Sequence, residues 1–243
     1  MNKYFVIGDV HGKATMLNEL LKNWDEKSQL IFLGDLIDRG ENSYSVLNMV
    51  SSLVKNKNAV CLMGNHEYMF LSWIDDPEEN YEHYQSNGGD STINSILGRP
   101  LEFPVDNLRD HNEIITNHSN LISLIRQMPY HLETKDTIFV HAGLDLTLPN
   151  WKETSNYQKV WIRKPFHEGL NQTGKTIIFG HTPVYRLLNN SIGIKEIYQS
   201  KDNKIGIDGG GVYGGVLHGI LFENGKISKD YIIHNDGIIA IDD

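Results

Sequence analysis

Six residues with metal-binding side chains come directly after short apolar runs: Asp9, His11, Asp35, Asn65, His141 and His181. Three imidazoles, two carboxylates and one amide form a mixed nitrogen and oxygen set, which suits Mn, Fe, Zn or Co better than Mg or Ca. Six ligands exceed what one open catalytic ion needs, so we expect two ions that share Asp35 as a bridging carboxylate. Such ions lie about 3.5–4 Å apart and support in-line displacement at phosphorus. The set predicts a two-metal site for phosphate esters, with manganese as the expected ion.

The neighbours of these residues add further groups that phosphate chemistry uses. If Asn65 faces the metals, His66 cannot point the same way, which leaves its imidazole free to act as a general acid toward the leaving group. Asp38 could orient that imidazole and keep it protonated, as carboxylates commonly do for histidine. The planar guanidinium of Arg39 matches the oxygens of a phosphate.

Five short apolar runs are expected to form the strands that position these side chains. They are Tyr4–Ile7, Leu30–Leu33, Val60–Met63, Ile138–Val140 and Ile177–Phe179. Runs this short suit strands that are covered on both faces. Helical patterns separate the first three runs, at Ala14–Trp24 and Ser43–Val54. The alternation predicts an α/β fold in which ligands collect at the carboxyl ends of the strands.

The middle of the chain lacks strand signals. Between about Tyr68 and Tyr130 the sequence is polar, with helix-like pieces at Tyr68–Ile74 and Asn120–Met128. We interpret residues 68–130 as a helical cap or insert over the sheet, within a single domain that spans residues 1–243.

The last part of the chain is alternating and rich in glycine. Its segments Ile192–Tyr198, Lys204–Asp208, Val216–Glu223 and Lys226–His234 predict a second, mainly antiparallel sheet. Asn224-Gly225, between the last two, is a hairpin signal.

Composition and charge limit the partners of this protein. The 243 residues carry 22 Lys and Arg against 31 Asp and Glu, a net charge of −9, without a long basic run. Nucleic-acid and membrane-binding faces need clustered positive charge, so we expect neither partner. The only cysteine, Cys61, lies in an apolar run and is expected to be a buried thiol. We find no signal-peptide pattern and no apolar run near the roughly 20 residues of a membrane span, which favours a cytoplasmic protein.

Five motifs resemble, in order, those of the PPP-type metallophosphoesterases of the calcineurin-like superfamily. They are Gly8-Asp9-Val10-His11-Gly12, Gly34-Asp35-Leu36-Ile37-Asp38-Arg39-Gly40, Gly64-Asn65-His66-Glu67, His141-Ala142-Gly143 and Gly180-His181-Thr182. That group includes serine/threonine protein phosphatases, small bacterial and bacteriophage protein phosphatases, and symmetrical diadenosine tetraphosphatases. Ile207-Asp208-Gly209-Gly210 resembles the family's Asp-Thr-Gly segment, with Gly209 in place of the threonine.

The resemblance implies a two-sheet β-sandwich flanked by helices, and two metal sites that share one carboxylate. The first metal would be held by Asp9, His11 and Asp35, and the second by Asp35, Asn65, His141 and His181. A hydroxide that bridges the two metals would attack phosphorus in line.

The resemblance also implies an acid dyad and a phosphate clamp. His66 with Asp38 would protonate the leaving group, and Arg39 would bind phosphate oxygens. The family carries a second phosphate-binding arginine between its last two histidine motifs. Trp161-Ile162-Arg163 occupies that place, which makes Arg163 the candidate.

These features predict a serine/threonine protein phosphatase, with a phosphorylated protein or a small phosphoester as the substrate. The alternative is a hydrolase of diadenosine tetraphosphate or a related nucleotide, because the chemistry at phosphorus is shared. A third possibility is a non-catalytic phosphoprotein-binding module. Such a module would be expected to have lost a metal ligand or the acid, and none is missing here.

The segment Gly169–Thr176 matches the P-loop pattern but lacks its context. A P-loop requires a helix after the loop, so that backbone amides and the helix dipole meet phosphate. The apolar run Ile177–Phe179 follows instead. We predict a turn that leads into a strand.

Overall fold

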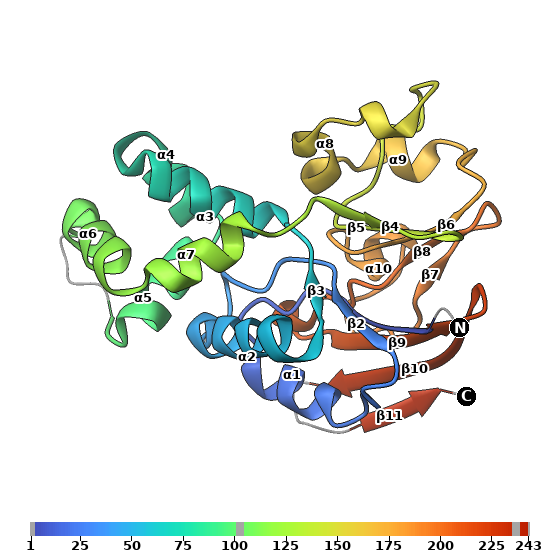
Figure 1. Ribbon diagram of the computed structural model, residues 1–243, viewed down its shortest axis with the longest axis horizontal. Helices are drawn as coiled ribbons and strands as arrows, with labels where there is room; N and C mark the ends of the chain where they lie inside the picture. The colour runs from blue at the N-terminus through green and yellow to red at the C-terminus, as the bar shows by residue number, and fades with distance from the viewer. Residues whose placement is uncertain (1–2, 101–104, 235–238, 243) are drawn as a thin grey trace.

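The strands form two sheets in the computed structural model, which describes residues 3–100, 105–234 and 239–242 (Figure 1). The six-stranded sheet has the order β11-β10-β9-β1-β2-β3, and the five-stranded sheet has the order β4-β5-β6-β8-β7. Strands β1, β2 and β3 are parallel to one another, as are β5, β6 and β8. The five-stranded sheet has an antiparallel strand at each edge, β4 and β7. In the six-stranded sheet the antiparallel pairs lie on one side, from β1 through β9 and β10 to β11, and the parallel strand β3 forms the other edge.

The strands are β1 Lys3–Ile7, β2 Gln29–Phe32, β3 Val60–Cys61, β4 His131–Glu133, β5 Thr137–Val140, β6 Thr176–Phe179, β7 Tyr198–Gln199, β8 Lys204–Gly206, β9 Val216–Glu223, β10 Lys226–His234 and β11 Ile239–Asp242. The α-helices are α1 Ala14–Leu21, α2 Ser43–Lys57, α3 Asn65–Asp75, α4 Pro77–Ser86, α5 Gly89–Leu97, α6 Asn107–Asn117, α7 Ser119–Arg126, α8 Asn156–Trp161, α9 Lys164–Glu168 and α10 Val184–Leu187. The short 3₁₀ helices η1 and η2 cover Trp151–Glu153 and Gly211–Tyr213.

A core of apolar side chains joins the facing surfaces of the two sheets. Val6, Ile31 and Ile220 of the six-stranded sheet pack in one cluster with Phe139 and Ile178 of the five-stranded sheet. All five side chains are fully buried. The two sheets are therefore the layers of a sandwich.

Helices cover the outer faces of both sheets, as Figure 1 shows. Phe5 and Ile7 alternate with the inward residues of β1 and pack with Leu17 of α1 and Val46 of α2. On the other sheet, β5 and β6 pack against Phe166 of α9. Apolar residues on both faces of each central strand explain the uninterrupted apolar runs. The predicted α/β sandwich with outer helices is confirmed.

Helices α3 to α7 follow β3 and lie to one side of the sandwich (Figure 1). Their buried residues Trp73 and Tyr84 are stacked with ring centroids 5.7 Å apart. These two rings belong to the same apolar cluster as the outer face of the six-stranded sheet. The predicted helical character of this region agrees with the structure, whereas its interpretation as an insert within one domain stays a prediction.

The C-terminal segments do not form a sheet of their own, so that prediction is wrong. Strands β9 and β10 extend the six-stranded sheet, because β9 pairs antiparallel with β1. Strand β8 pairs parallel with β6 in the other sheet. The predicted strand Ile192–Tyr198 is also wrong: most of it is an exposed loop, and only Tyr198 lies in β7. The hairpin at Asn224-Gly225 is confirmed, since both residues have positive φ and join β9 to β10.

Two further predictions concern single segments. The P-loop-like segment is a turn between α9 and β6, and Lys175 within it forms an ion pair with Glu133 at 3.0 Å. Cys61 is a buried free thiol.

Among the described residues, we find no helix with both the length and the apolar character that crossing a bilayer requires. The cytoplasmic location stays a prediction.

The packing between the sheets leads to a stability prediction. Phe139→Ala removes a fully buried ring from the sandwich core and should lower the free energy of unfolding by about 3–5 kcal/mol. Leu170→Ala is the control, because Leu170 is 61% exposed and its loss should change that free energy by less than about 0.5 kcal/mol. Urea denaturation followed by circular dichroism measures both, and equal effects would contradict the assigned core.

Candidate metal centre

Buried side chains from both sheets meet at the carboxyl ends of β1, β2, β5 and β6. Ligand atoms of His11, Asp35 and His66 lie within 4.8 Å of one another, and so do those of Asp35, His141 and His181. Asp35 belongs to both groups. Two clusters that share one carboxylate are the arrangement that a pair of metal ions needs.

The distances within the second group are short. Nε2 of His141 lies 3.3 Å from Oδ1 of Asp35. Oδ1 of Asn65 lies 3.0 Å from Nε2 of His141 and 2.8 Å from Nδ1 of His181. The amide oxygen of Asn65 thus adds a fourth possible metal ligand to those of Asp35, His141 and His181.

The first group differs from the set that the family resemblance implies. Asp9 lies in neither compact group, and its carboxylate instead accepts hydrogen bonds from the backbone N–H of His181 at 3.0 and 3.2 Å. His66 takes part in its place, with Nε2 4.0 Å from Oδ2 of Asp35. The expectation that His66 points away from the side faced by Asn65 is wrong. Both residues begin α3, where successive side chains are only about 100° apart.

His66 and Asp38 form a buried pair. Nδ1 of His66 lies 2.7 Å from Oδ2 of Asp38, and both side chains are fully buried. Burial raises the pKa of Asp38 to about 7 and lowers the pKa of His66 to about 3. A protonated carboxyl that faces Nδ1 leaves the imidazole N–H on Nε2.

Each of the two arginines lies beside a different histidine of the centre. Nη1 of Arg39 lies 2.9 Å from Nε2 of His11, and the guanidinium also stacks on the ring of Tyr213 at 5.4 Å. Nη1 of Arg163 donates to Oγ1 of Thr182 at 2.8 Å, next to His181. Both arginines remain exposed enough to meet a ligand.

Left-handed backbone conformations gather at this site. Ten non-glycine residues of the described chain have positive φ, and five of them are candidate site residues: His11, Asp35, Asp38, Arg39 and His181. Four of the other five are asparagines, which tolerate this conformation. Backbone strain of this kind persists where the surrounding structure enforces it, which is typical of functional sites. No sequence signal reveals it.

Glu67 holds the strained Asp35 turn, a role that sequence reasoning missed. Its carboxylate accepts from the backbone N–H groups of Asp35 at 2.8 Å, Leu36 at 2.7 Å and Gly64 at 3.1 Å. A Cβ on Gly64 would come within 2.2 Å of Oδ1 of Asp35, so only glycine fits there. The motif Gly64–Glu67 therefore contains both side chains of the site and a residue that holds its backbone in place.

Asp208 is a second residue that lies at the centre without a predicted role. Burial, followed by the carboxylate of Asp208, raises the pKa of Asp9, and burial raises the pKa of Asp208 itself to about 6. The departure at Gly209 has a steric explanation. A Cβ there would lie 2.3 Å from the carbonyl oxygen of Val216 and 2.8 Å from Cδ2 of the buried His218, so a threonine would clash.

The charges and orphaned atoms fit divalent cations. Burial, followed by the carboxylates of Asp208 and Asp35, raises the pKa of Asp9 well above its usual value. Burial alone would also raise the pKa of Asp35, but neighbouring imidazoles outweigh it and hold that pKa well below its usual value. Nε2 atoms of His66 and His181 are buried without a hydrogen-bond partner. Metal ions would offset the carboxylate repulsion, and one of them would give Nε2 of His181 a partner.

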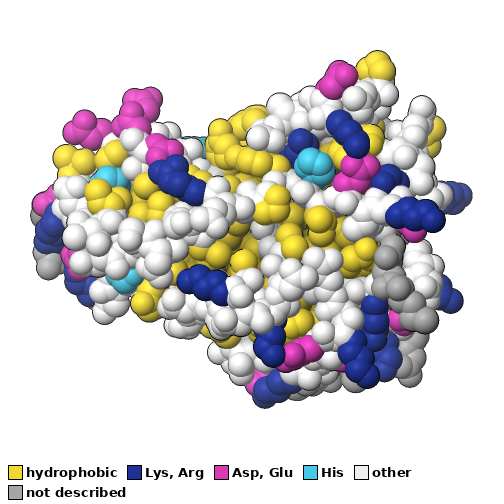
Figure 2. Space-filling view, in the orientation of Figure 1, with side chains coloured by type: hydrophobic (Ala, Val, Ile, Leu, Met, Phe, Trp, Pro, Cys, Tyr) yellow, Lys and Arg dark blue, Asp and Glu magenta, His cyan; other side chains and the backbone are white. Residues whose placement is uncertain are grey.

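An aromatic strip leads away from the centre between α3 and α8. The ring of Trp161 lies 6.0 Å from that of His181, and Tyr157 lies 6.2 Å from Trp161 and 6.3 Å from Tyr68. Tyr157 is 59% exposed. Figure 2 shows hydrophobic side chains in the hollow between the helical segment, α3 to α7, and the part of the molecule that carries α8. Flat ring faces are thus available beside the predicted phosphate site.

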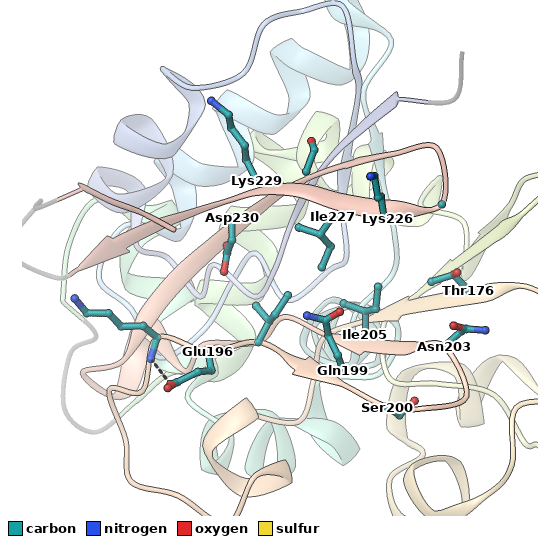
Figure 3. A pocket seen from close by; sticks show the side chains of 14 residues that line it. Thr176, Glu196, Gln199, Ser200, Asn203, Ile205, Lys226, Ile227, Lys229 and Asp230 are labelled. Carbon is teal, nitrogen blue, oxygen red and sulfur yellow. Dashed lines mark hydrogen bonds between the residues drawn. The ribbon is translucent and has the colours of Figure 1, made fainter. Parts of the chain in front are cut away.

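A cavity of about 520 Å³ between β10 and the β7–β8 edge contains none of the predicted site residues. Figure 3 shows Asp230 pointing into it from β10, while Gln199 and Ile205 line the opposite side. Asp230 also pairs with Nδ1 of the buried His218 at 2.9 Å. Side chains of both charges line this space, so it has no clear preference for an anion.

A family model described as calcineurin-like phosphoesterase matches residues 3–234. The chain belongs to this family. A metal-ligand cluster at strand ends within a helix-flanked sandwich agrees with the match, and family membership implies divalent metal ions.

Relatives of this phosphoesterase include bis(5'-nucleosyl)-tetraphosphatases. The symmetrical enzyme of Coxiella burnetii is 30% identical over 152 residues, which cover 60% of this chain and only 43% of that protein. The asymmetrical enzyme PrpE of Bacillus cereus is 26% identical, with 93% of this chain and 92% of that protein covered.

Solved structures share the fold of this phosphoesterase. One, provisionally described as a diadenosine tetraphosphatase, has a TM-score of 0.66 at 21% identity over 96% of this chain and 95% of that one. The cold-active protein-tyrosine phosphatase of a Shewanella species has a TM-score of 0.59 at 17% identity over 99% and 80%.

The shared carboxylate leads to a metal-binding prediction. Asp35→Asn should reduce the Mn²⁺ retained in equilibrium dialysis from two ions per chain toward none, because both groups lose a charged ligand. The rise in thermal midpoint that Mn²⁺ gives the native protein should disappear with it. Asp136→Asn, at an exposed aspartate, should change neither measurement. Unchanged dialysis of a folded Asp35→Asn variant would contradict the centre.

Proposed function

We propose that this chain is a two-metal phosphoesterase with its metals at Asp9, His11, Asp35, Asn65, His141 and His181. Two bound divalent ions, of which manganese suits this mixed ligand set, would supply activation of a water and neutralisation of charge at phosphorus. The support is the pair of clusters that share Asp35 and the calcineurin-like family match. Asp9 follows β1 and accepts a hydrogen bond from the backbone N–H of His181, and its carboxylate would contribute to holding the ions.

The buried His66–Asp38 pair is the observation that supports the choice of substrate. An alkoxide is a poor leaving group, so the ester of an alcohol gains most from a positioned general acid. A nucleotide phosphate departs as a stable anion and gains less. His66 would protonate the departing oxygen from Nε2, while Asp38, 2.7 Å from Nδ1, resupplies the proton. The favoured substrates are therefore phosphomonoesters of alcohols, as in phosphoserine and phosphothreonine proteins.

Arg39 and Arg163 would bind the phosphate oxygens that do not react. They approach from the His11 side and the His181 side. Guanidinium forks bind such oxygens in a bidentate manner and add positive charge where the transition state spreads negative charge.

Hydrolysis of a dinucleoside tetraphosphate is the second candidate. The relatives from Coxiella and Bacillus carry that activity in their names, and the Bacillus enzyme aligns over 93% of this chain. The aromatic strip offers a physical reason, because Tyr157 and Trp161 present ring faces near His181 on which a nucleobase can stack.

The acid role leads to a leaving-group prediction. His66→Asn should lower kcat on a phosphothreonine peptide by about 10²- to 10⁴-fold and lower it much less on p-nitrophenyl phosphate, whose leaving group needs little protonation. His83→Asn, at an exposed histidine, should leave both rates unchanged. An equal loss on both substrates would argue against general acid catalysis by His66.

The two substrate proposals are separated by a direct comparison. Purified protein with Mn²⁺ is assayed on a phosphothreonine peptide and on diadenosine tetraphosphate, and kcat/KM is measured for each. We expect the peptide to be preferred. Preference for the dinucleotide, together with a raised KM for it in Tyr157→Ala, would replace the first substrate by the second.

A further inference from the structure

The Asp38–Arg39 turn adopts a conformation that its own residues disfavour. Both have left-handed backbones, with φ of 71° and 68°. Two successive non-glycine residues of this kind are strained and need restraint from outside the turn. The turn carries one residue of the proposed acid dyad and one of the proposed phosphate clamp, so whatever restrains it also sets the geometry of both.

The helical segment between β3 and β4 provides that restraint for the backbone. The N–H of Asp38 donates to Oγ1 of Thr92 on α5 at 2.8 Å. The N–H of Arg39 donates to the carbonyl oxygen of Gly88, between α4 and α5, at 3.2 Å. Oγ of Ser43 lies 2.9 Å from Oγ1 of Thr92 and ties the contact to α2.

The same helices hold the carboxylate of Asp38. Oδ2 faces His66, while Oδ1 accepts from the hydroxyl of Tyr84 and from Oγ1 of Thr92, each at 2.7 Å. All four side chains are fully buried. With two hydroxyls fixed on Oδ1, the carboxyl plane cannot rotate, and Oδ2 stays aimed at the imidazole.

Tyr84 cannot withdraw from this contact without disrupting the helical segment. Its ring stacks on Trp73 at 5.7 Å and meets Phe70 edge-on at 6.0 Å. The indole N–H of Trp73 donates in turn to Asn107 on α6 at 2.7 Å. The phenol is therefore set by several helices, as a rigid support for a functional group requires.

We propose that Tyr84 and Thr92 are positioning residues for the general acid His66, and that α4 and α5 set the acid's direction through Asp38. The inference rests on the proposed function. It gives the helical segment a part in the reaction. That part matters most for phosphate esters with strongly basic leaving groups, because these need a proton from His66. A hydrogen-bonded carboxylate fixes both the tautomer and the ring orientation of a histidine, so a loosened Asp38 misdirects the proton.

The test uses Tyr84→Phe and Thr92→Val in the full chain loaded with Mn²⁺. On a phosphothreonine peptide, kcat should fall about tenfold to a hundredfold in each variant with little change in KM. On p-nitrophenyl phosphate the fall should stay below about threefold. Tyr81→Phe is the matched control, because that phenol on the same helix donates to Asp90 at 3.1 Å and should leave both rates intact.

Thr92→Ser separates positioning from packing, since it keeps the hydroxyl and should retain most of the peptide activity. Equal losses on both substrates in Tyr84→Phe and Thr92→Val would overturn the inference, because general damage to the site has no leaving-group bias. His66→Asn, assayed in parallel, distinguishes failure of the acid role of His66 from failure of the positioning role of Tyr84 and Thr92. If it shows the bias and the two variants do not, only the positioning role fails. If it shows none, the acid role and this inference fail together.

Discussion

The buried carboxylate of Asp35 ties the two sheets to one centre. Its oxygens lie 3.3 Å from Nε2 of His141, at the end of a strand in one sheet, and 3.6 Å from Nε2 of His11, at the end of a strand in the other. The backbone N–H of His66 donates to the same carboxylate at 3.1 Å. Because these partners come from separate sheets, the centre forms only if the sandwich core keeps the sheets at a fixed separation. The chemistry at the ends of the sheets therefore depends on the packing between them.

Strain at the site has identifiable supports. Each left-handed residue there costs about 1–3 kcal/mol, which is large against the roughly 5–15 kcal/mol of net stability of a typical domain. Glu67 holds the turn at Asp35 through three backbone amides, and Thr92 and Gly88 hold the turn at Asp38. The helical segment thus stabilises the conformation of the site from behind, in addition to bordering it.

An acidic protein can receive a phosphate dianion here because charge is arranged locally. The chain carries a net charge of −9, yet Arg39 and Arg163 flank the centre. Burial, followed by the carboxylates of Asp208 and Asp35, raises the pKa of Asp9. Divalent ions held by these residues would offset the carboxylate charge and reverse the sign of the local field. Metal binding and substrate binding are in this sense electrostatically coupled.

The sequence by itself indicated that side chains such as Asp35, His141 and His181 meet at one centre. Each follows an apolar run, and the carboxyl ends of parallel strands come together by a local rule, so Asp35 and His141 could be placed without knowing the sheet order. Tertiary structure decided which sheet β8, β9 and β10 join, because an alternating segment can pair with any free strand edge. It also decided the direction of His66, which depends on where α3 begins, and brought Tyr84 and Thr92 to Asp38 across 46 and 54 residues. A hydrogen bond over such a distance leaves no periodic signal in the sequence, since it depends on how the helices pack.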